Sequence, residues 1–255
     1  TPSNSSAASD VYKRQKPSDD GRDAILHCPN AVDQLNLLKR KIYNRILSLR
    51  PWIFYHLYLG CIKEMDKNDR IAKLFKKLQF ENIITMVDTH TFSKNPKESI
   101  KKKEKIKKYE PLKKVLKYTN IFFSSYEEAM MISNTFGYSI SKIEDFLKIL
   151  VEEFFDEEIK LFGVTDGLDV YSVYGNKKEV FGPLHIRSNY FVKPESLVGA
   201  GDSFRAGVLL YLLKNKEEFE KNKLNLREAI NMGNLISSLY ISAPKENSCL
   251  LYTSD

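Results

Sequence analysis

Short apolar runs alternate with segments of helical periodicity along most of this 255-residue chain. We expect strands over residues 52–59, 83–87, 121–123 and 159–164, where apolar side chains follow one another without a break. Between them, apolar residues recur every three or four positions, which predicts helices over residues 32–47, 71–78, 112–116, 125–136 and 141–155. Such an alternation favours parallel strands joined by helical crossovers, with helices on both faces of one sheet. The sequence therefore predicts an α/β fold with a mainly parallel sheet.

The last strand signals indicate a hairpin rather than another crossover. Residues 168–174 read as a strand, and Gly175-Asn176 fits a two-residue turn into a strand near Val180. These strands would extend the parallel sheet in the antiparallel sense. Because ligands of such sheets bind beyond the carboxyl ends of the strands, we expect the chemistry among the residues that follow those ends.

Composition excludes several other classes of protein. Apolar residues make up 42% and charged residues 29% of the chain, which rules out a disordered chain, a collagen and a coiled-coil rod. The longest nearly apolar run covers residues 52–62, whereas a membrane-spanning helix needs about 20 residues. Few and widely spaced cysteines favour a reducing compartment, and we expect a cytoplasmic protein. The net charge of +7 suits nucleotides, phosphorylated metabolites or nucleic acid as partners.

The two ends of the chain look foreign to the rest. Residues 1–15 are small and polar without apolar periodicity, and they resemble the translated adapter scar seen at the ends of assembled reading frames. Residues 247–255 resemble the scar at the other end. We therefore expect one domain over residues 16–246, cut at both ends; a disordered native tail is the alternative.

The most informative motif is a small-residue turn that leads into an apolar helix. Gly199, Ala200, Gly201 and Asp202 stand directly before the apolar run that begins at Phe204. Three backbone N–H groups with little side chain around them would face a ligand at a helix N-terminus, where unpaired donors and the macrodipole favour anions. Asp202, in the first turn, is either an acidic cap of that helix or a base that faces the anion site.

The longer string GAGDSFRAG, at residues 199–207, resembles the signature of the ribokinase-like (phosphofructokinase-B type) carbohydrate kinase family. The order of elements agrees with that family over residues 52–243. The resemblance implies a three-layer α/β/α sandwich, here with most of its small β-sheet lid missing. It also implies an enzyme that transfers the γ-phosphate of ATP to a hydroxyl of a sugar or related small metabolite, with ATP and Mg²⁺ as cofactors.

The same resemblance assigns roles to the motif. Asp202 would be the catalytic base that takes the proton from the acceptor hydroxyl, and the amides of Gly199, Ala200 and Gly201 would form the anion hole for the transferred phosphoryl group. The chain has no Walker A motif, so a P-loop enzyme is not expected. Ser196, Leu197 and Val198 replace the Asp-Thr-x that usually precedes the first glycine, which puts potassium activation in doubt.

Weaker matches extend the resemblance to the metal. Glu128 matches the glutamate with which the family organises Mg²⁺ through water, although Ser125 stands where the family has Asn. A serine followed by a glutamate three residues later is also a helix capping box, and both interpretations can hold together. Asp88 ends a strand where the family places an acidic residue near the phosphates; a turn-forming aspartate is the alternative.

Other weak matches concern the nucleotide. Thr165 and Gly167 lie in a turn with which the family touches the nucleotide, although Val164 replaces its first glycine; a simple turn explains them equally well. Asn234 falls on a helix that the family places beside adenine, and core packing is the alternative. The histidines show no metal-binding spacing with one another or with the cysteines.

Two other functions compete with the kinase. Six lysines within residues 101–108 would neutralise the phosphates of nucleic acid, yet no arginine or interleaved aromatic accompanies them, and a solvated surface loop is the simpler explanation. A catalytically silent relative that binds a partner is the third hypothesis.

We expect a small-molecule substrate that the sequence does not name, no membrane partner and no nucleic acid, and we keep a homodimer open. Because the family contacts its sugar mostly from its N-terminal third, we expect this chain alone to be weakly active or inactive.

Overall fold

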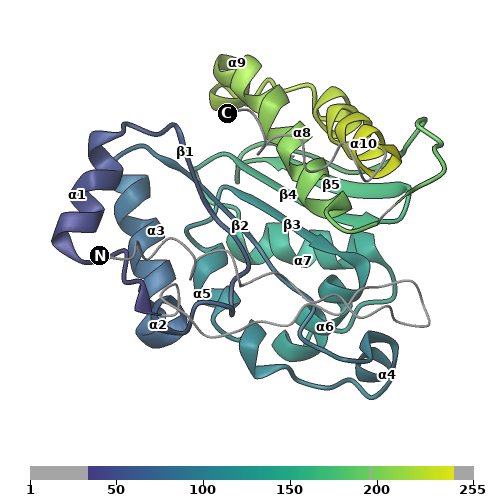
Figure 1. The fold of residues 1–255 in the computed structure, drawn as a ribbon, viewed down its shortest axis with the longest axis horizontal. Helices are drawn as coiled ribbons and strands as arrows, with labels where there is room; N and C mark the ends of the chain where they lie inside the picture. Colours follow the sequence, from purple (N-terminus) through teal and green to yellow (C-terminus); the bar gives the residue numbers. More distant parts are fainter. Residues whose placement is uncertain (1–33, 196, 244–255) are drawn as a thin grey trace, which may run out of the picture.

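The computed structural model describes residues 34–195 and 197–243, and a six-stranded sheet forms its centre (Figure 1). The strands lie side by side in chain order: β1 (Ile53–His56), β2 (Ile84–Asp88), β3 (Ile121–Ser125), β4 (Lys160–Asp166), β5 (Asp169–Gly175) and β6 (Val180–Arg187). β1 to β4 are parallel, and β5 and β6 continue the sheet as antiparallel strands, as predicted. The expected foreign ends, residues 1–15 and 247–255, lie outside the described residues.

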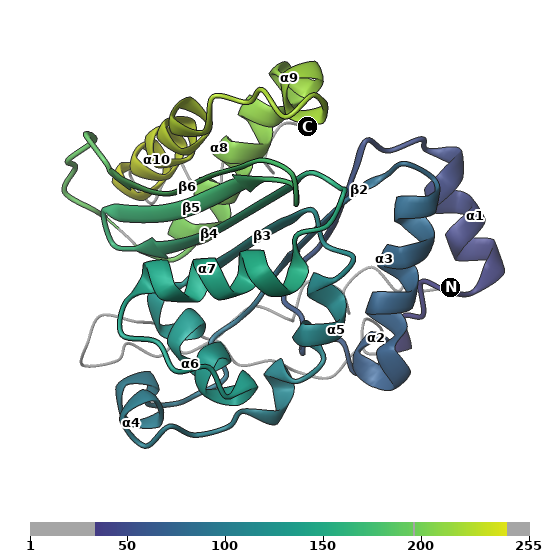
Figure 2. The same ribbon diagram turned by 180° about the vertical axis from the view of Figure 1, so that it is seen from behind.

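Helices cover both faces of the sheet, so the predicted three-layer α/β/α sandwich is confirmed (Figure 2). One face carries α3 (Arg70–Phe80), α5 (Leu112–Leu116), α6 (Tyr126–Phe136) and α7 (Ile143–Phe154); the other carries α8 (Ala200–Lys214), α9 (Lys216–Glu220) and α10 (Leu226–Ser242). The remaining helices are α1 (Arg40–Ser48), α2 (Lys63–Asp66) and α4 (Pro96–Lys101). Over the described part of the chain, no helix is long and apolar enough to cross a membrane.

Neighbouring residues of a strand enter different cores, because successive side chains point to opposite faces of the sheet. Phe122 of β3 lies in the same buried core as Leu74 of α3 and Leu147 of α7. Phe123, the next residue, lies in the second core and meets Phe204 of α8 edge to face, with ring centroids 5.4 Å apart. Strands that are buried on both faces read as continuous apolar runs, which is why the sequence identifies them.

The first helix is shorter than predicted. α1 begins at Arg40, whereas the periodicity predicts a helix over residues 32–47, of which 32 and 33 lie outside the described residues. The side chain of Asn36 accepts a hydrogen bond from the amide of Leu38 at 3.0 Å. Asparagine thus offers the backbone a local alternative to the helix and delays its start.

The hairpin of β5 and β6 is confirmed, but the two-residue turn is wrong. Four residues, 176–179, separate the strands, and the amide of Asn176 donates to the carbonyl of Glu179 at 2.9 Å. The side-chain oxygen of Asn176 accepts from the amides of Lys178 and Glu179 at 2.9 and 3.1 Å. This side chain imitates a backbone turn and so closes a longer loop than the sequence suggests.

The lysine-rich run is only partly a loop. Its first lysine, Lys101, ends α4, a short helix that begins with Pro96 and is capped by Asn95, whose side chain accepts from the amide of Glu98 at 3.3 Å. Residues 101–105 are exposed. This exposure agrees with the solvated surface that we expect, and the absence of a nucleic-acid partner stays a prediction.

Candidate active site

The N-terminus of α8 is the centre of the candidate site. Gly199, which precedes the first turn, has a φ of 85°, a left-handed conformation that glycine adopts without strain. A side chain there would also meet α10, because a Cβ atom at Gly199 would lie 2.8 Å from Cε1 of Tyr240. Gly199, Ala200 and Gly201 are themselves partly exposed, and a helix N-terminus of this kind suits an anion.

The predicted anion hole, Gly199, Ala200 and Gly201, is already held in shape by neighbouring groups. The amide of Ala200 donates to the carbonyl of Leu197 at 3.2 Å, and the hydroxyl of Ser237 on α10 donates to the carbonyl of Ala200 at 3.0 Å. An anion at this position would have to share or replace the hydrogen bond to Leu197. The role of the three residues as an anion hole stays a prediction.

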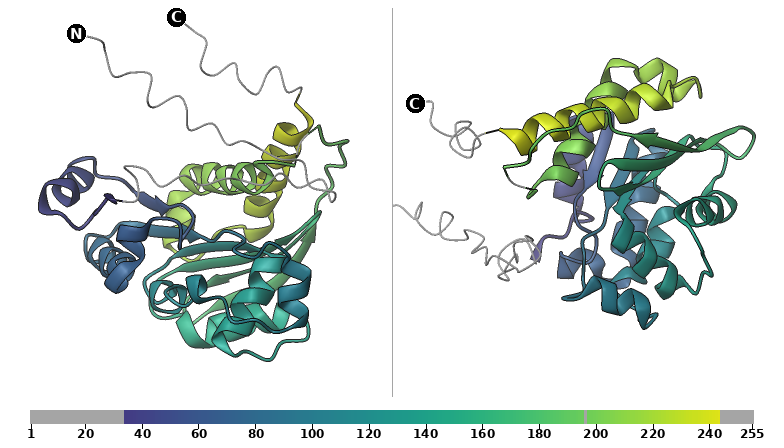
Figure 3. Two further views of the ribbon diagram at one scale, coloured as in Figure 1. Left: turned by 60° about the horizontal axis from the view of Figure 1, so that its bottom comes forward. Right: turned by 90° about the vertical axis from the view of Figure 1, so that its right-hand side faces the viewer.

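α8 and α10 pack closely against each other on the same face of the sheet (Figure 3). Small residues allow this close approach. A Cβ atom at Gly207 would lie 2.6 Å from the carbonyl oxygen of Met232, and one at Gly233 would lie 2.6 Å from the ring of Phe204. Gly207, the last glycine of the GAGDSFRAG string, thus serves helix packing, which fixes where the first turn of α8 points.

Asp202, the predicted base, lies in the first turn of α8 with 48% of its side chain exposed. The hydroxyl of Tyr58 donates to its two carboxylate oxygens at 3.0 and 2.9 Å. Nη2 of Arg205, one helical turn further on, donates to Oδ1 at 2.7 Å. The carboxylate is therefore oriented by two donors, the distant Tyr58 and the neighbouring Arg205, and it is still open to solvent.

Asp88 ends β2 and is fully buried beside this group. It accepts from the hydroxyl of Tyr55 and the amide of Tyr58, both at 2.6 Å, and pairs with Nη2 of Arg205 at 3.0 Å. Burial raises the pKa of Asp88, although Arg205 and Tyr55 act in the opposite direction. Both carboxylate oxygens are engaged, and the bond to Tyr58 turns the chain out of β1 after His56, three residues earlier than the sequence predicts.

Glu128 and Ser125 form the predicted capping box at the start of α6. The amide of Glu128 donates to the hydroxyl of Ser125 at 3.3 Å, and the amide of Ser125 donates to Oε2 of Glu128 at 3.1 Å. The hydroxyls of Thr89 and Thr91 also donate to this carboxylate, at 2.9 and 3.2 Å. Burial raises the pKa of Glu128, and these hydrogen bonds oppose that rise.

The described residues do not form a protein cage for a metal ion. Residues 34–195 and 197–243 contain no group of three or more His, Cys, Asp or Glu side chains placed to hold one. Mg²⁺ usually keeps several waters and takes one or two carboxylates together with substrate phosphates, so a site of this kind needs no protein cage. The assignments of Glu128 and Asp88 to Mg²⁺ stay predictions.

The predicted nucleotide contacts lie at the end of β4 (Thr165 and Gly167) and on α10 (Asn234). Thr165, near the end of β4, pairs in register with Ser125 of β3, and Gly167 has a φ of 58° in the turn that follows. The hydroxyl of Thr165 donates to the carbonyl of Ser124 at 3.5 Å, a weak bond that a ligand could replace. Asn234 of α10 is buried, and its side-chain nitrogen has no hydrogen-bond partner. A buried amide without a partner costs about 1–3 kcal/mol, so a polar ligand or water would stabilise it.

Sequence reasoning missed three side chains that organise this site: Tyr55, Tyr58 and Arg205. Arg205 occupies the variable position of GAGDSFRAG, and a spacing of three residues from Asp202 is the signal that would have placed both on one helix face. The two tyrosines carry no local signal, because their partners come from β2 and α8.

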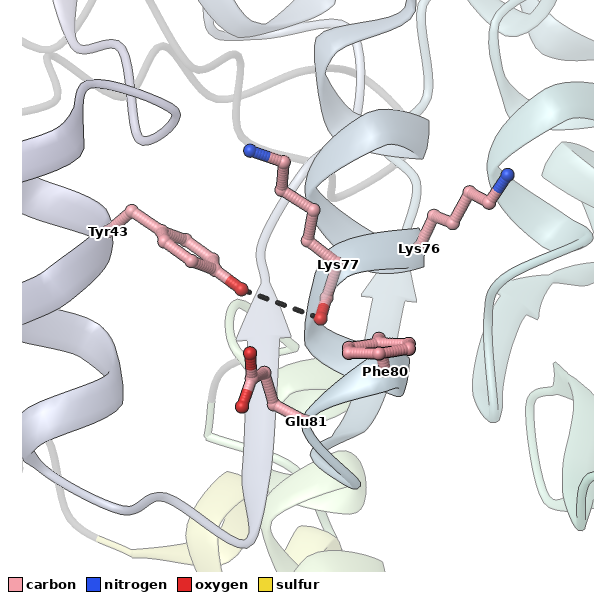
Figure 4. A pocket seen from close by; sticks show the side chains of 5 residues that line it. All are labelled: Tyr43, Lys76, Lys77, Phe80 and Glu81. Atoms are coloured by element: carbon pink, nitrogen blue, oxygen red, sulfur yellow. Dashed lines mark hydrogen bonds between the residues drawn. The ribbon is translucent and has the colours of Figure 1, made fainter.

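The pocket between α1 and α3 lies elsewhere (Figure 4). It is lined by Tyr43, Lys76, Lys77, Phe80 and Glu81. Phe80 and Glu81 lie at the end of α3, a few residues before β2 begins at Ile84, so this pocket sits near the amino end of β2, whereas Asp88 ends that strand. Its two lysines are exposed, and its lining contains one weak hydrogen bond, from the Tyr43 hydroxyl to the Lys77 carbonyl at 3.4 Å. This lining does not form a catalytic arrangement.

The fold and this site define a three-layer α/β protein with an acidic residue in the first turn of α8. A family model described as pfkB family carbohydrate kinase matches residues 89–251, which is more than half of the chain. The chain belongs to this family. A comparison with curated proteins gave no match.

Solved structures of the same fold are similar at low sequence identity. The apo adenosine kinase of Trypanosoma brucei brucei gives a TM-score of 0.58 with 16% identity over 81% of this chain and 56% of that chain. The adenosine kinase of Schistosoma mansoni in complex with 2-fluoroadenosine gives 0.57 with 13% identity over 82% and 55%. A putative ribokinase II of E. coli in complex with ATP and Mg²⁺ gives 0.52 with 18% identity over 78% and 55%. The chain thus spans little more than half the length of these structures, and the likeness shows the fold.

Proposed function

We propose that this chain carries the nucleotide-binding and catalytic part of an ATP-dependent kinase whose acceptor is a hydroxyl of a sugar or nucleoside. One observation carries the proposal: Asp202 stands half-exposed in the first turn of α8, directly beside Gly199, Ala200 and Gly201. Family membership supports kinase chemistry. The adenosine kinase and ribokinase neighbours support a sugar or nucleoside as the acceptor.

In the proposed reaction Asp202 accepts the proton of the acceptor hydroxyl. The hydroxyl oxygen bonds to the γ-phosphorus of ATP while the bond from that phosphorus to the β–γ bridging oxygen breaks, so ADP and a phosphate ester are released. A positioned general base contributes about 10²–10⁴-fold to such a reaction. The amides of residues 199–201 and the dipole of α8 would stabilise the charge on the transferred phosphoryl group.

The hydrogen bonds of Asp202 set a condition on this reaction. The hydroxyl of Tyr58 is within 3.0 Å of both carboxylate oxygens, where the acceptor hydroxyl would have to bind. The acceptor would therefore displace the Tyr58 hydroxyl or take one oxygen while Tyr58 keeps the other. Arg205 approaches Oδ1 from within the helix and leaves the exposed side of the carboxylate open.

The remaining predicted residues would hold the nucleotide and its ion. Thr165 and Gly167 lie at the β4–β5 turn, and the buried amide of Asn234 supplies an unused donor on α10. Mg²⁺, when bound with ATP, would neutralise phosphate charge, and Glu128 would contact it through water. Asp88, with both oxygens engaged, would support the site rather than bind the ion.

A thermal-melt titration of the chain tests the proposal. A ligand that binds only the folded state raises the melting temperature by mass action. We expect a saturable rise with Mg-ATP, a smaller rise with Mg-GTP and none with a short RNA. A cooperative melt that Mg-ATP leaves unmoved would contradict the proposal, and a rise with RNA alone would favour the lysine-rich run at residues 101–108. With Mg-ATP binding shown, ribose and adenosine as acceptors would test the acceptor class.

A further inference from the structure

We propose that Arg205 is the positioning and charge-balancing residue of this site: it ties Asp202 to the buried Asp88 and offsets the carboxylate charge that would repel the phosphates of a nucleotide. The inference deepens the proposed function and rests on it. Its basis is one shared atom, since Nη2 of Arg205 lies 2.7 Å from Oδ1 of Asp202 and 3.0 Å from Oδ2 of Asp88.

This pairing joins two elements that the chain places far apart. Asp88 ends β2, whereas Arg205 and Asp202 share one face of α8, three residues apart. Arg205 is 11% exposed and Asp88 is fully buried, so their ion pair is shielded from water and salt. The rotation of α8 about its axis, and with it the direction of Asp202, is therefore fixed against the end of the sheet.

The charges around Arg205 explain why a cation is needed there. Asp88, Asp202 and Glu128 are carboxylates within its electrostatic reach, and Tyr55 and Tyr58 add neutral donors. Burial acts to lower the pKa of Arg205, but the carboxylates of Asp88 and Asp202 raise it, so the guanidinium stays charged. Without this cation, a nucleotide would meet a cluster of uncompensated negative charge.

Arg205 also lies next to the predicted anion hole. A Cβ atom at Gly201 would lie 3.4 Å from its Nη1 atom, and its Nε atom is buried without a hydrogen-bond partner. A competing role follows from this position, in which Arg205 binds a phosphate directly. The two roles differ in one respect: neutralising Asp202 compensates for the loss of a charge-balancing arginine but not for the loss of a phosphate ligand.

The test uses four single variants of this chain: Arg205→Met, Arg205→Lys, Asp202→Asn and Asp88→Asn. Two double variants combine Arg205→Met with Asp202→Asn or with Asp88→Asn. Arg227→Met, an exposed arginine on α10, is the matched control. Melting temperatures are measured without ligand, and Mg-ATP affinity is measured by titration. Neither readout requires turnover.

We expect Arg205→Met to weaken Mg-ATP binding about tenfold, the effect of one uncompensated charge a few ångströms away. Asp202→Asn in that background should restore the affinity to within about threefold of the wild-type chain, and Arg205→Lys should retain most of it. Without ligand, Arg205→Met should lower the melting temperature, and added Asp88→Asn should recover part of the loss, because it removes a buried carboxylate without a partner. Arg227→Met should change neither quantity.

Three outcomes separate the hypotheses. Weak Mg-ATP binding that Asp202→Asn does not restore would overturn charge balance in favour of a direct phosphate contact. Wild-type affinity in Arg205→Met would overturn the inference while leaving the proposed function intact. A wild-type chain that melts cooperatively but binds no Mg-ATP would overturn the proposed function and this inference with it.

Discussion

The hydroxyl of Tyr58 lies 3.0 and 2.9 Å from the two carboxylate oxygens of Asp202, across 144 residues of sequence. Tyr58 follows β1 with a φ of 55°, an unusual conformation for a residue with a side chain. Such conformations persist where the surrounding structure holds them and often mark functional sites. Here the loop after β1 is held by Asp88, which accepts the Tyr58 amide, and by Asp202, which accepts its hydroxyl.

Tyr58→Phe should lower the free energy of unfolding by about 1 kcal/mol, because a hydrogen bond to a half-exposed carboxylate is lost. Tyr55→Phe is the matched comparison and should cost about 2 kcal/mol, since the Tyr55 hydroxyl donates to the fully buried Asp88. Denaturant unfolding measures both. In a double-mutant cycle, Tyr58→Phe should be nearly neutral once Asp202 is Asn. Equal costs in both backgrounds would show that the hydroxyl contributes nothing through Asp202.

Asp202→Asn should reduce phosphoryl transfer by about 10²–10⁴-fold, the usual contribution of a general base. The amide keeps the shape of the carboxylate but does not accept the hydroxyl proton, so Mg-ATP affinity should be unchanged or tighter. Because this chain alone is expected to be weakly active or inactive, transfer to ribose and adenosine is measured with radiolabelled ATP in a full-length homologue that carries the equivalent substitution, in parallel with Mg-ATP titrations. A loss of turnover below about tenfold would remove Asp202 from the role of base.

Gly199→Ala should destabilise the chain by about 2 kcal/mol and weaken Mg-ATP binding. The left-handed conformation alone costs a side chain about 1–2 kcal/mol, and the added Cβ atom would lie 2.8 Å from Tyr240. Gly137→Ala separates these causes, because Gly137 has a φ of 80° and open space around its Cβ position. It should carry only the conformational cost and leave nucleotide binding unchanged. Equal effects of the two substitutions on Mg-ATP affinity would contradict a special role for residue 199.

The sequence was sufficient for the parts of the fold that depend on local pattern. β2 and β3 are buried on both faces, so their apolar runs identify them. The capping box of Ser125 and Glu128 is a spacing of three residues. The predicted turn over residues 199–201 is shorter in the structure: only Gly199 has a left-handed backbone, and Ala200 and Gly201 already belong to α8. Each of these features is decided by residues that are neighbours in the chain.

What the sequence could not predict depends on contacts between distant segments. β1 ends at His56 because Tyr58 bonds to Asp88, and α1 starts late because Asn36 turns the backbone. The tie between Arg205 and Asp88 requires α8 to lie over the end of β2, which follows from the packing of two cores rather than from any motif. The sequence therefore predicts Asp202 as the base from its motif, but it does not predict the side chains that surround Asp202.

Gly207→Ala should destabilise the chain by about 1–3 kcal/mol, because its Cβ atom would lie 2.6 Å from a backbone oxygen of α10. Helix propensity favours alanine by about 1 kcal/mol, so overpacking must exceed that gain for the chain to lose stability. Gly201→Ala is the matched control: it is helical and would meet only the flexible end of Arg205, at 3.4 Å. It should be neutral or stabilising. A stabilised Gly207→Ala chain would show that α8 and α10 can separate freely.

His56, the last residue of β1, should make stability depend on pH. Its side chain is buried, its Nε2 atom has no hydrogen-bond partner, and burial lowers its pKa to about 4 from 6.5. Between these values the unfolded chain binds a proton that the folded chain does not, so this residue reduces stability as the pH falls from about 6.5 to about 4 and adds no further loss below. The full effect is at most about 3.5 kcal/mol, at about 1.4 kcal/mol for each unit of pKa.

His56→Gln isolates this contribution, because the amide does not titrate in that range. The difference in unfolding free energy between the wild-type and His56→Gln chains, measured with denaturant from pH 7 to pH 4, should shift against the wild type as the pH falls. Parallel stability curves for the wild-type and His56→Gln chains would mean that His56 takes up its proton without unfolding, which places a water or an acidic partner beside Nε2.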